Sequence, residues 1–313
     1  MAQTKIERDV AGSISPITGK NDVTLLETID TKKLADAWHK QFGISITDEI
    51  KGCQELRLYR CNHTGLKYFE PKFIAGSNKL YEKLQGLDWY YMPDKWEHYL
   101  ALRFLKAGMR ILEIGSGTGH FITRAEKAGM QATGIELNQQ AATTARERGL
   151  NVICTSLVEE ADQNQGSYDA VCSFQVLEHV SSPAELIENS LKLLKPGGIL
   201  IYGVPNDDSF LKYQFNILNM PPHHMTLWSA ATFKRLEQYF PMKLEEVFTE
   251  PLASYHVEGY LASCRSRIPA REAVQRIVFN NITKALLRGM LHVGLRKFIS
   301  GQSLFVLYRK NDE

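Results

Sequence analysis

The sequence has few of the features that mark membrane-spanning or secreted proteins. No run in its 313 residues approaches the roughly 18 consecutive apolar residues that a spanning helix needs. Residues 1–23 are polar and mixed in charge, with no apolar segment like that of a secretory signal. The five cysteines are scattered and odd in number, which argues against a disulfide framework. We therefore expect a protein of the cytoplasm.

Paired metal-binding cysteines are also missing. No Cys-x-x-Cys occurs, and Cys61 and His63 are the one closely spaced pair of a cysteine and a histidine that invites a zinc interpretation. A structural zinc ion takes four ligands, commonly from paired knuckles. We expect no metal.

Charge is nearly balanced overall but not along the chain. The net charge is +2, from 37 Lys and Arg against 35 Asp and Glu. Residues 265–313 hold ten Lys and Arg against three acidic residues, a balance of +7, so the remainder carries −5. No recognised DNA- or RNA-binding module accompanies this charge, and nucleic-acid binding is not expected.

Short apolar runs alternate with helical segments between residues 110 and 204. Runs typical of strands lie at 110–114, 131–136, 151–155, 168–174 and 199–204. The best-marked helix begins after Ser182 and Pro183, with Glu185 completing a capping box. Strands that alternate with helices of this length predict an α/β fold, with a parallel sheet covered on both faces.

The regions on either side have other patterns. Upstream, residues 31–42 predict a helix that ends at Gly43, and residues 55–70 predict a β-hairpin turning at 62–65. Asp94, with Glu97 three residues later, predicts a capped helix that runs to about residue 107. Downstream, the sequence predicts an irregular aromatic segment at 206–228, a helix at 229–239, and strands at 243–249 and 303–309.

A glycine-rich loop follows the first strand of the regular region, with the sequence Glu113-Ile-Gly-Ser-Gly-Thr-Gly119. Glycine lets the backbone turn tightly and approach a ligand closely, because no Cβ is in the way. Glu136 stands at the tip of the next strand, where a carboxylate can accept hydrogen bonds from ribose hydroxyls. Ligands of open parallel sheets bind beyond the carboxyl ends of the strands, so the loop predicts a nucleoside site.

The spacing and charge of the loop indicate which nucleoside is bound. A dinucleotide loop usually reads Gly-x-Gly-x-x-Gly and lays a pyrophosphate on a helix N-terminus. Here the spacing is Gly-x-Gly-x-Gly, and Glu113 stands directly before it. An acid there would repel a pyrophosphate and suits a cationic ligand. This favours S-adenosylmethionine over the two alternatives, a nicotinamide cofactor and a purely structural turn.

Residues 110–204 resemble the class I S-adenosylmethionine-dependent methyltransferases, especially small-molecule O-methyltransferases of the ubiquinone-biosynthesis type. The matching segments are Ile111-Leu-Glu-Ile-Gly-Ser-Gly-Thr-Gly119, Gly134-Ile-Glu-Leu137, Tyr168-Asp-Ala-Val171, Val176-Leu-Glu-His-Val180 and Leu194-Lys-Pro-Gly-Gly198. The flanks, from Tyr81 to Trp96 and at Pro221-Pro-His-His224, are similar to methyltransferases of bacterial surface-glycan and sugar pathways. The resemblance implies a Rossmann-like, doubly wound and mostly parallel sheet of seven strands.

The resemblance also implies roles for individual residues. Glu136 would hold the ribose, Leu137 would pack on the adenine, and Gln175 would face the methionine portion. Many relatives have an acid at the adenine edge, which Cys154-Thr-Ser-Leu157 lacks. The remaining expected cofactor residues are Glu113, Gly115, Ser116, Gly117, Gly119, Ser156 and Leu157.

Two sets of side chains are candidates for the chemistry. A hydroxyl acceptor must lose a proton, and histidine is the natural base near neutral pH. His179, His223 and His224 are the catalytic candidates, with backbone hydrogen bonding or loop packing as the alternative. Tyr81, Tyr90, Tyr91 and Trp96 could cover the sulfonium through cation–π attraction, or could simply pack in a core.

We divide the chain into an N-terminal extension, 1–93, with the hairpin and an aromatic lid, and a methyltransferase domain, 94–313. Within the domain, 206–228 is expected to be a substrate loop and 250–302 a basic helical insertion between the last two strands. The insertion is interpreted as a helix pair packed on the sheet, a cap for an anionic or nucleotide-linked substrate, or a peripheral membrane contact through 265–310.

The predicted function is methyl transfer to a small molecule, with O-methylation of a sugar or glycan precursor favoured. N- or C-methylation and a non-catalytic cofactor-binding or scaffold protein are the alternatives. Fold alone does not name the substrate.

Overall fold

The computed structural model describes residues 13–87, 90, 92–213, 215–266 and 279–312. Its centre is a seven-stranded sheet with the order β10-β11-β8-β7-β4-β5-β6. The strands from β8 to β6 run parallel, and β11 pairs antiparallel with both β8 and β10. The bounds are β4 Arg110–Ile114, β5 Gln131–Ile135, β6 Val152–Ile153, β7 Tyr168–Phe174, β8 Leu194–Pro205, β10 Met242–Pro251 and β11 Ser300–Lys310.

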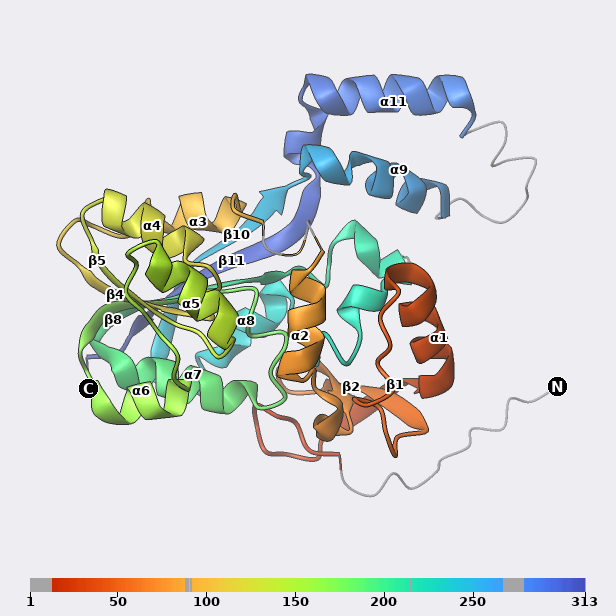
Figure 1. The fold of residues 1–313 in the computed structure, drawn as a ribbon. Coiled ribbons are helices and arrows are strands. Elements are labelled where there is room, and N and C mark those ends of the chain that lie inside the picture. The colour runs from red at the N-terminus through yellow and green to blue at the C-terminus, as the bar shows by residue number, and fades with distance from the viewer. Residues whose placement is uncertain (1–12, 88–89, 91, 214, 267–278, 313) are drawn as a thin grey trace.

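Helices cover both faces of this sheet, as Figure 1 shows. Successive residues of a strand point to opposite faces, so Leu112 and Leu200 enter one core while Ile111 and Ile201 enter the other. The first core is closed by α6 Leu157–Gln163, α7 Pro183–Leu193 and α8 Ala230–Leu236. The second is closed by α3 Trp96–Ala101, α4 His120–Lys127 and α5 Gln139–Glu147. The predicted doubly wound, mostly parallel α/β fold is confirmed.

A second, antiparallel sheet has the order β1-β2-β3-β9. Its strands are β1 Val23–Asp30, β2 Glu55–Cys61, β3 Lys67–Glu70 and β9 Thr226–Leu227. The predicted helix at 31–42 is present as α1 Thr31–Phe42, which ends at Gly43 with φ +68°. Further along lie η1 Lys72–Ile74 and α2 Asn78–Gln85.

The second sheet is completed from a distant part of the chain. β9 pairs with β3, and a salt bridge of 2.7 Å joins Lys67 to Asp207. Ile217 and Met225 are buried with Leu34 and Trp38 in one core. The short helices η2 Phe210–Tyr213 and η3 Ile217–Asn219 lie in the same 206–228 segment. This segment therefore packs with the N-terminal residues that the sequence assigns to a separate extension.

One predicted helix start is wrong, and a second is right in position but lacks its predicted capping bond. α3 has Lys95 at its N-cap, because the Asp94 carboxylate binds the Tyr99 hydroxyl and the Arg124 guanidinium instead of capping the helix. The helix also ends at Ala101, earlier than the predicted residue 107. Ser182 lies at the N-cap position of α7, but its side chain makes no capping hydrogen bond.

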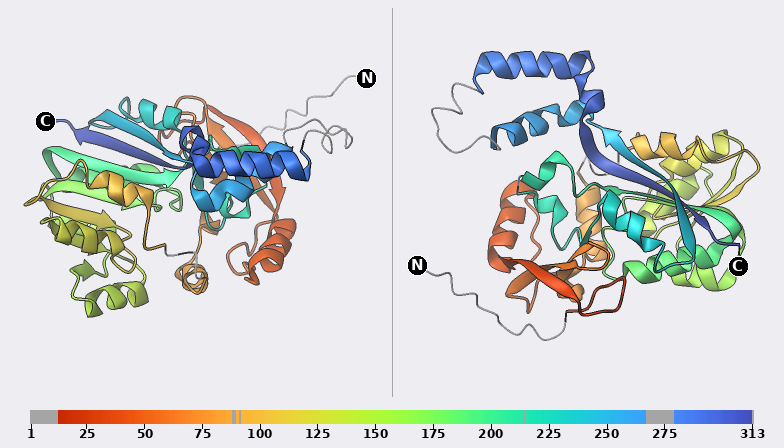
Figure 2. Two further views of the ribbon diagram at one scale, coloured as in Figure 1. Left: turned by 90° about the horizontal axis from the view of Figure 1, so that it is seen from above. Right: turned by 180° about the vertical axis from the view of Figure 1, so that it is seen from behind.

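The segment between β10 and β11 leaves the body of the molecule, as Figures 1 and 2 show from three directions. We call residues 254–298 the arm. It contains η4 Ser254–His256, α9 Val257–Ser266, α11 Asn281–Val293 and η5 Leu295–Phe298. The predicted helical residues 271–278 lie outside the described part. No helix in the described part of the chain is long and apolar enough to cross a bilayer.

Candidate functional site

A cavity of about 660 Å³ lies where the parallel strands end. Loops after β4, β5, β7 and β8 meet there with residues of the N-terminal unit and the root of the arm. This is the edge at which open parallel sheets bind ligands. The predicted site residues that line the cavity are Tyr81, Tyr90, Trp96, Gly115, Glu136, Leu137, Leu157, Gln175, His179, His223 and His224.

Five predicted cofactor residues are not in the cavity lining. Glu113 points into the protein, where its Oε2 atom has no hydrogen-bond partner and burial raises the carboxyl pKa well above its usual range. Ser156 caps α6 in a box with Glu159. The others are Ser116, Gly117 and Gly119. The repulsion of a pyrophosphate that the sequence assigns to Glu113 therefore has little support, because this acid is buried and lies outside the cavity lining.

The backbone of the glycine loop supports the cavity wall. Gly115 has φ +69°, and a Cβ there would lie 2.5 Å from the Val176 Cγ2 atom. The Gly117 N–H donates to Glu136 Oε2 at 2.8 Å, and the Asn138 N–H donates to Glu136 Oε1 at 2.8 Å. Glu136 thus joins the loops after β4 and β5. Leu137 next to it is 63 % exposed, which leaves an apolar platform at the rim.

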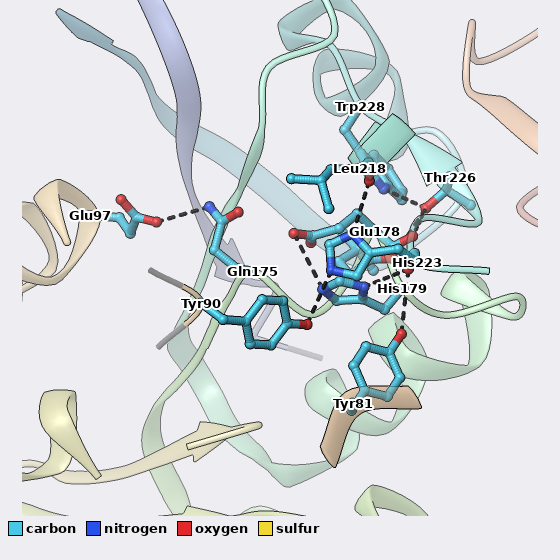
Figure 3. Close-up of polar contacts among 11 residues, drawn as sticks. Tyr81, Tyr90, Glu97, Gln175, Glu178, His179, Leu218, His223, Thr226 and Trp228 are labelled. Atoms are coloured by element: carbon cyan, nitrogen blue, oxygen red, sulfur yellow. Dashed lines mark hydrogen bonds and ion pairs between the residues drawn. The ribbon is translucent and has the colours of Figure 1, made fainter. Parts of the chain in front are cut away.

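Three histidine rings meet in the cavity, as Figure 3 shows for His179 and His223. The His179 and His223 centroids are 4.6 Å apart, and those of His223 and His224 are 4.4 Å apart in a stacked arrangement. One ligand nitrogen from each ring lies within 4.8 Å of the others, the one such cluster of metal-ligand type in the described part of the chain. The predicted candidates are therefore brought together, in a geometry that also suits a metal ion.

Hydrogen bonds fix the tautomers of two of these rings. A carbonyl oxygen only accepts, so His179 Nδ1–H donates to the His223 carbonyl at 2.7 Å and leaves Nε2 with its lone pair. His223 Nδ1–H likewise donates to the Leu218 carbonyl at 2.9 Å, and its Nε2 accepts from the Tyr90 hydroxyl at 3.1 Å. Nε2 of His179 is thus an available proton acceptor, whereas Nε2 of His223 is engaged.

Burial keeps these rings uncharged. Desolvation lowers the pKa of His179 to about 4, and desolvation with the nearby His179 lowers the pKa of His223 to about 3. The same causes place the pKa of His224 well below its usual range. All three imidazoles are therefore neutral at physiological pH.

Glu178 is a site residue that the sequence interpretation missed. It is 1 % exposed, lines the cavity, and neither carboxyl oxygen has a hydrogen-bond partner. Oε1 lies 3.8 Å from Nε2 of His179, and burial raises the Glu178 pKa to about 8. The signal was present in the segment Val176-Leu-Glu-His-Val180, but a carboxyl group in a loop gives no sign that it will be buried.

Glu97 has a different role from the helix-capping role that the sequence predicts. Glu97, predicted as a capping residue, lines the cavity and accepts a hydrogen bond of 2.9 Å from Gln175 Nε2. Gln175 has φ +60°, the one positive value outside glycine in the described residues. Such a conformation is uncommon, and it turns the Gln175 side chain toward α3. Glu250 also lines the cavity, with a pKa that burial raises to about 7.

The aromatic residues of the predicted lid separate into two groups. Tyr81 and Tyr90 face the histidines: the Tyr81 ring is 5.4 Å from His179 and the Tyr90 ring 5.7 Å from His223, between centroids. Trp96 lines the cavity and packs edge-on against Phe305, 6.5 Å away. Tyr91 lies outside the described residues.

Comparison with known proteins shows which families part of the chain resembles. Residues 89–240 match a family model described as a methyltransferase domain. This part of the chain, just under half of it, is therefore similar to methyltransferase domains. The ubiquinone biosynthesis O-methyltransferase of Xanthomonas oryzae is 34 % identical over 114 residues, 34 % of this chain and 48 % of the relative. That of Idiomarina loihiensis is 31 % identical over 152 residues, covering 45 % and 63 %. The chain thus spans about half to two thirds of the length of these relatives.

Solved structures resemble the methyltransferase domain at low identity. A SAM-dependent methyltransferase from Archaeoglobus fulgidus superposes with a TM-score of 0.46 at 17 % identity, over 75 % of this chain and 95 % of that one. The YcgJ protein from Bacillus gives a TM-score of 0.46 at 18 % identity, over 69 % and 99 %.

The cavity fits S-adenosylmethionine, the cofactor that the sequence resemblance implies. Gly115 lets the backbone lie close against Val176 in the cavity lining, Glu136 lies at the tip of β5, and exposed Leu137 offers an apolar surface for adenine. The Glu97 carboxyl group lies in the same lining, where an acidic side chain suits the positive charge of a sulfonium. Of the two residues predicted along the adenine edge, Leu157 lines the cavity and Ser156 does not.

Proposed function

We propose that this protein transfers the methyl group of S-adenosylmethionine to a hydroxyl oxygen of a small molecule. One observation carries the proposal: a single cavity contains both Gly115 and Glu136 of the cofactor loops and the buried group formed by Glu178 and the three histidines. A nucleoside half and a proton-accepting half are what an O-methyltransferase needs within one enclosed space.

The bound cofactor supplies an electrophilic methyl group on a sulfonium with a neutral leaving group. The chain's residues must align the acceptor oxygen, exclude water and remove a proton. His179 is suited to the last task, because its Nδ1–H bond to the His223 carbonyl leaves Nε2 free to accept a proton from the acceptor. Tyr81, whose hydroxyl donates to the same carbonyl at 3.4 Å, packs against the ring and restricts its rotation.

Glu178 would support the proton transfer. A proton taken up by His179 creates a buried imidazolium, which is costly unless an opposite charge lies near. The carboxylate 3.8 Å away provides that charge once it is ionised. Since burial raises the Glu178 pKa to about 8, we expect turnover to rise as the pH increases through this value.

The finer proposal is a sugar or glycan precursor as the acceptor. Neutral amides and hydroxyls suit the many hydroxyl groups of such a molecule, and the cavity is lined by Asn78, Asn206, Ser209, Asn216, Asn219, Gln302 and Ser303. An anionic or nucleotide-linked acceptor has less support. Lys95 is the one Lys or Arg in the described lining, which contains five acidic residues: Asp94, Glu97, Glu136, Glu178 and Glu250.

The test measures release of S-adenosylhomocysteine with panels of sugars, nucleotide-linked sugars and catechols, followed by mass spectrometry of the product. The His179→Asn variant should lose roughly 10²- to 10⁴-fold in kcat, the usual contribution of a positioned base, with cofactor affinity unchanged. The matched control is His39→Asn, which changes an exposed histidine of α1.

Two results would count against the proposal. Near-normal turnover of His179→Asn would exclude it as the base. Tight cofactor binding with no methylated product from any panel, including a whole metabolite extract, would favour the non-catalytic alternative. A product methylated at nitrogen or carbon would retain the cofactor site and replace the acceptor.

A further inference from the structure

The outer side of α11 carries an apolar stripe that the arm does not use for its own packing. Ile282, Leu286, Met290 and Val293 follow one another at steps of four, four and three residues, so their side chains lie on one face of the helix. They are 72, 63, 55 and 91 % exposed. Large apolar side chains scattered singly on a surface are ordinary, but four in line on one helix form a patch.

The stripe continues past the end of α11. Phe298 in η5 is 87 % exposed and Leu295 is 40 % exposed. The opposite side of α11 holds the arm together, because Leu291 is buried with Val257 and Leu261 in a small core. The stripe is therefore additional to the contacts that fold the arm.

The arm has a large excess of positive charge. Residues 254–299 contain eight Lys and Arg against Glu258 and Glu272, a balance of +6, and residues 273–311 contain no acid at all. Lys284 and Arg288 lie on the polar side of α11 and pair with Glu258 at 3.4 and 2.6 Å. Lys297, next to Phe298, is exposed.

We propose that the arm docks on the surface of a bilayer that contains anionic lipid, with the α11 stripe and Phe298 at the boundary between headgroups and acyl chains. An interfacial helix combines an apolar face with a basic polar side, and α11 has the exposed apolar stripe on one side and Lys284 and Arg288 on the other. The arm stands clear of both sheets in Figures 1 and 2, so the body of the protein does not block the approach.

The same features disfavour other occupants of the stripe. A second copy docked face to face would bring two arms of balance +6 together, and like charges oppose such a contact. A nucleic acid would complement the positive charge of the arm, but it would not bury the apolar side chains of Ile282, Leu286 and Val293. Anionic lipid satisfies both the charge and the apolar stripe, and this docking does not depend on the proposed methyl transfer.

The test is flotation of the full-length protein with vesicles of phosphatidylcholine alone or with 30 % phosphatidylglycerol, a composition of roughly the anionic content used to probe basic surfaces. Wild type should float with the anionic vesicles, at least about ten-fold more than with the neutral ones, and less at high salt. The double variant Leu286→Asp/Val293→Asp should lose this binding. Phe73→Asp, at a 64 % exposed apolar residue of η1, is the matched control and should bind like wild type.

Circular dichroism and thermal unfolding of all variants establish that each is folded, as expected for changes at exposed positions. Wild type that ignores both vesicle types would overturn the proposal. So would wild type that is dimeric by light scattering, becomes monomeric in the double variant and does not float, since the stripe would then join two copies. Equal flotation of the double variant and the control would also contradict it.

Discussion

Gly115 shows at the scale of one residue how the site depends on a missing side chain. Its positive φ and its closeness to Val176 bring the loops after β4 and β7 together at the cavity. Val176 belongs to the same short segment as Glu178 and His179. A change at Gly115 therefore acts on the cofactor half and the proton-accepting half of the cavity at once.

We predict that Gly115→Ala weakens S-adenosylmethionine binding at least about ten-fold in calorimetry and lowers the free energy of unfolding by about 1–3 kcal/mol, because alanine is strained at this φ and its Cβ meets Val176. Gly108→Ala is the control, since Gly108 also has a positive φ, +84°, but no atom within 4 Å of a built Cβ. Equal cofactor affinity in the two variants would show that the crowding is unimportant.

Glu178 makes stability depend on pH. Its folded pKa of about 8 lies above the ordinary value of 4.5, so the folded state holds a proton that the unfolded state releases. Its contribution to stability is fully present below pH 4.5 and is lost as the pH rises through 8. We predict that Glu178→Gln removes this loss, on the order of 4 kcal/mol across the window. Urea unfolding at pH 5 and pH 8.5 measures it, and a variant whose stability falls like wild type's would contradict it.

The residues of the site were predictable in part. The glycine loop, Glu136 and the three histidines follow from local spacing and from the resemblance, and the structure gathers most of them around one cavity. Glu97 and Glu178 were not recognised, because burial of a carboxyl group depends on chain segments far away. The Glu178 backbone carbonyl accepts hydrogen bonds from the N–H groups of Met225 and Thr226, which come from a segment more than 40 residues later in the chain.

At the scale of elements, the β/α alternation was predicted well because apolar runs and capping residues are local signals. The strand at 151–155 is shorter, with only Val152–Ile153 paired. β1 was missed because most of its side chains are exposed and no clean alternation marks it. β9 is two residues long and exists only through its pairing with β3. No local pattern specifies such a strand.

A substitution at Ser156 tests whether this residue stabilises α6 or contacts the cofactor. Its side chain accepts from the Glu159 N–H, and the Glu159 carboxylate accepts from the Ser156 N–H. We predict that Ser156→Ala lowers the free energy of unfolding by about 1 kcal/mol, the usual effect of losing an N-cap, and leaves cofactor affinity within about two-fold. A large loss of affinity with unchanged stability would restore the cofactor contact implied by the resemblance.

At the scale of the whole molecule, the smaller sheet is built from two distant parts of the chain. β9, Ile217 and Met225 come from the C-terminal part of the sequence and complete the N-terminal sheet and its core. Sequence spacing suggests a boundary at residue 93 because the composition changes there. The sequence does not indicate that residues more than 120 positions later pack against the N-terminal sheet.

We therefore predict that a chain starting at residue 94 will not fold independently. It would expose Ile217 and Met225 and leave β9 unpaired. We expect aggregation, or an unfolding midpoint lower by at least about 10 °C, since several kcal/mol of core burial are lost. Thermal unfolding and light scattering measure this, and a monodisperse fragment with the midpoint of the full chain would establish two independent units.

Tyr255 and His256 line the cavity and stand directly before α9, so the base of the arm is also part of the chamber's rim. Any tilt of α9 against the body must carry these two rings with it. The segment that we propose to contact lipid and the cavity that we propose to bind the cofactor are therefore joined through these two residues.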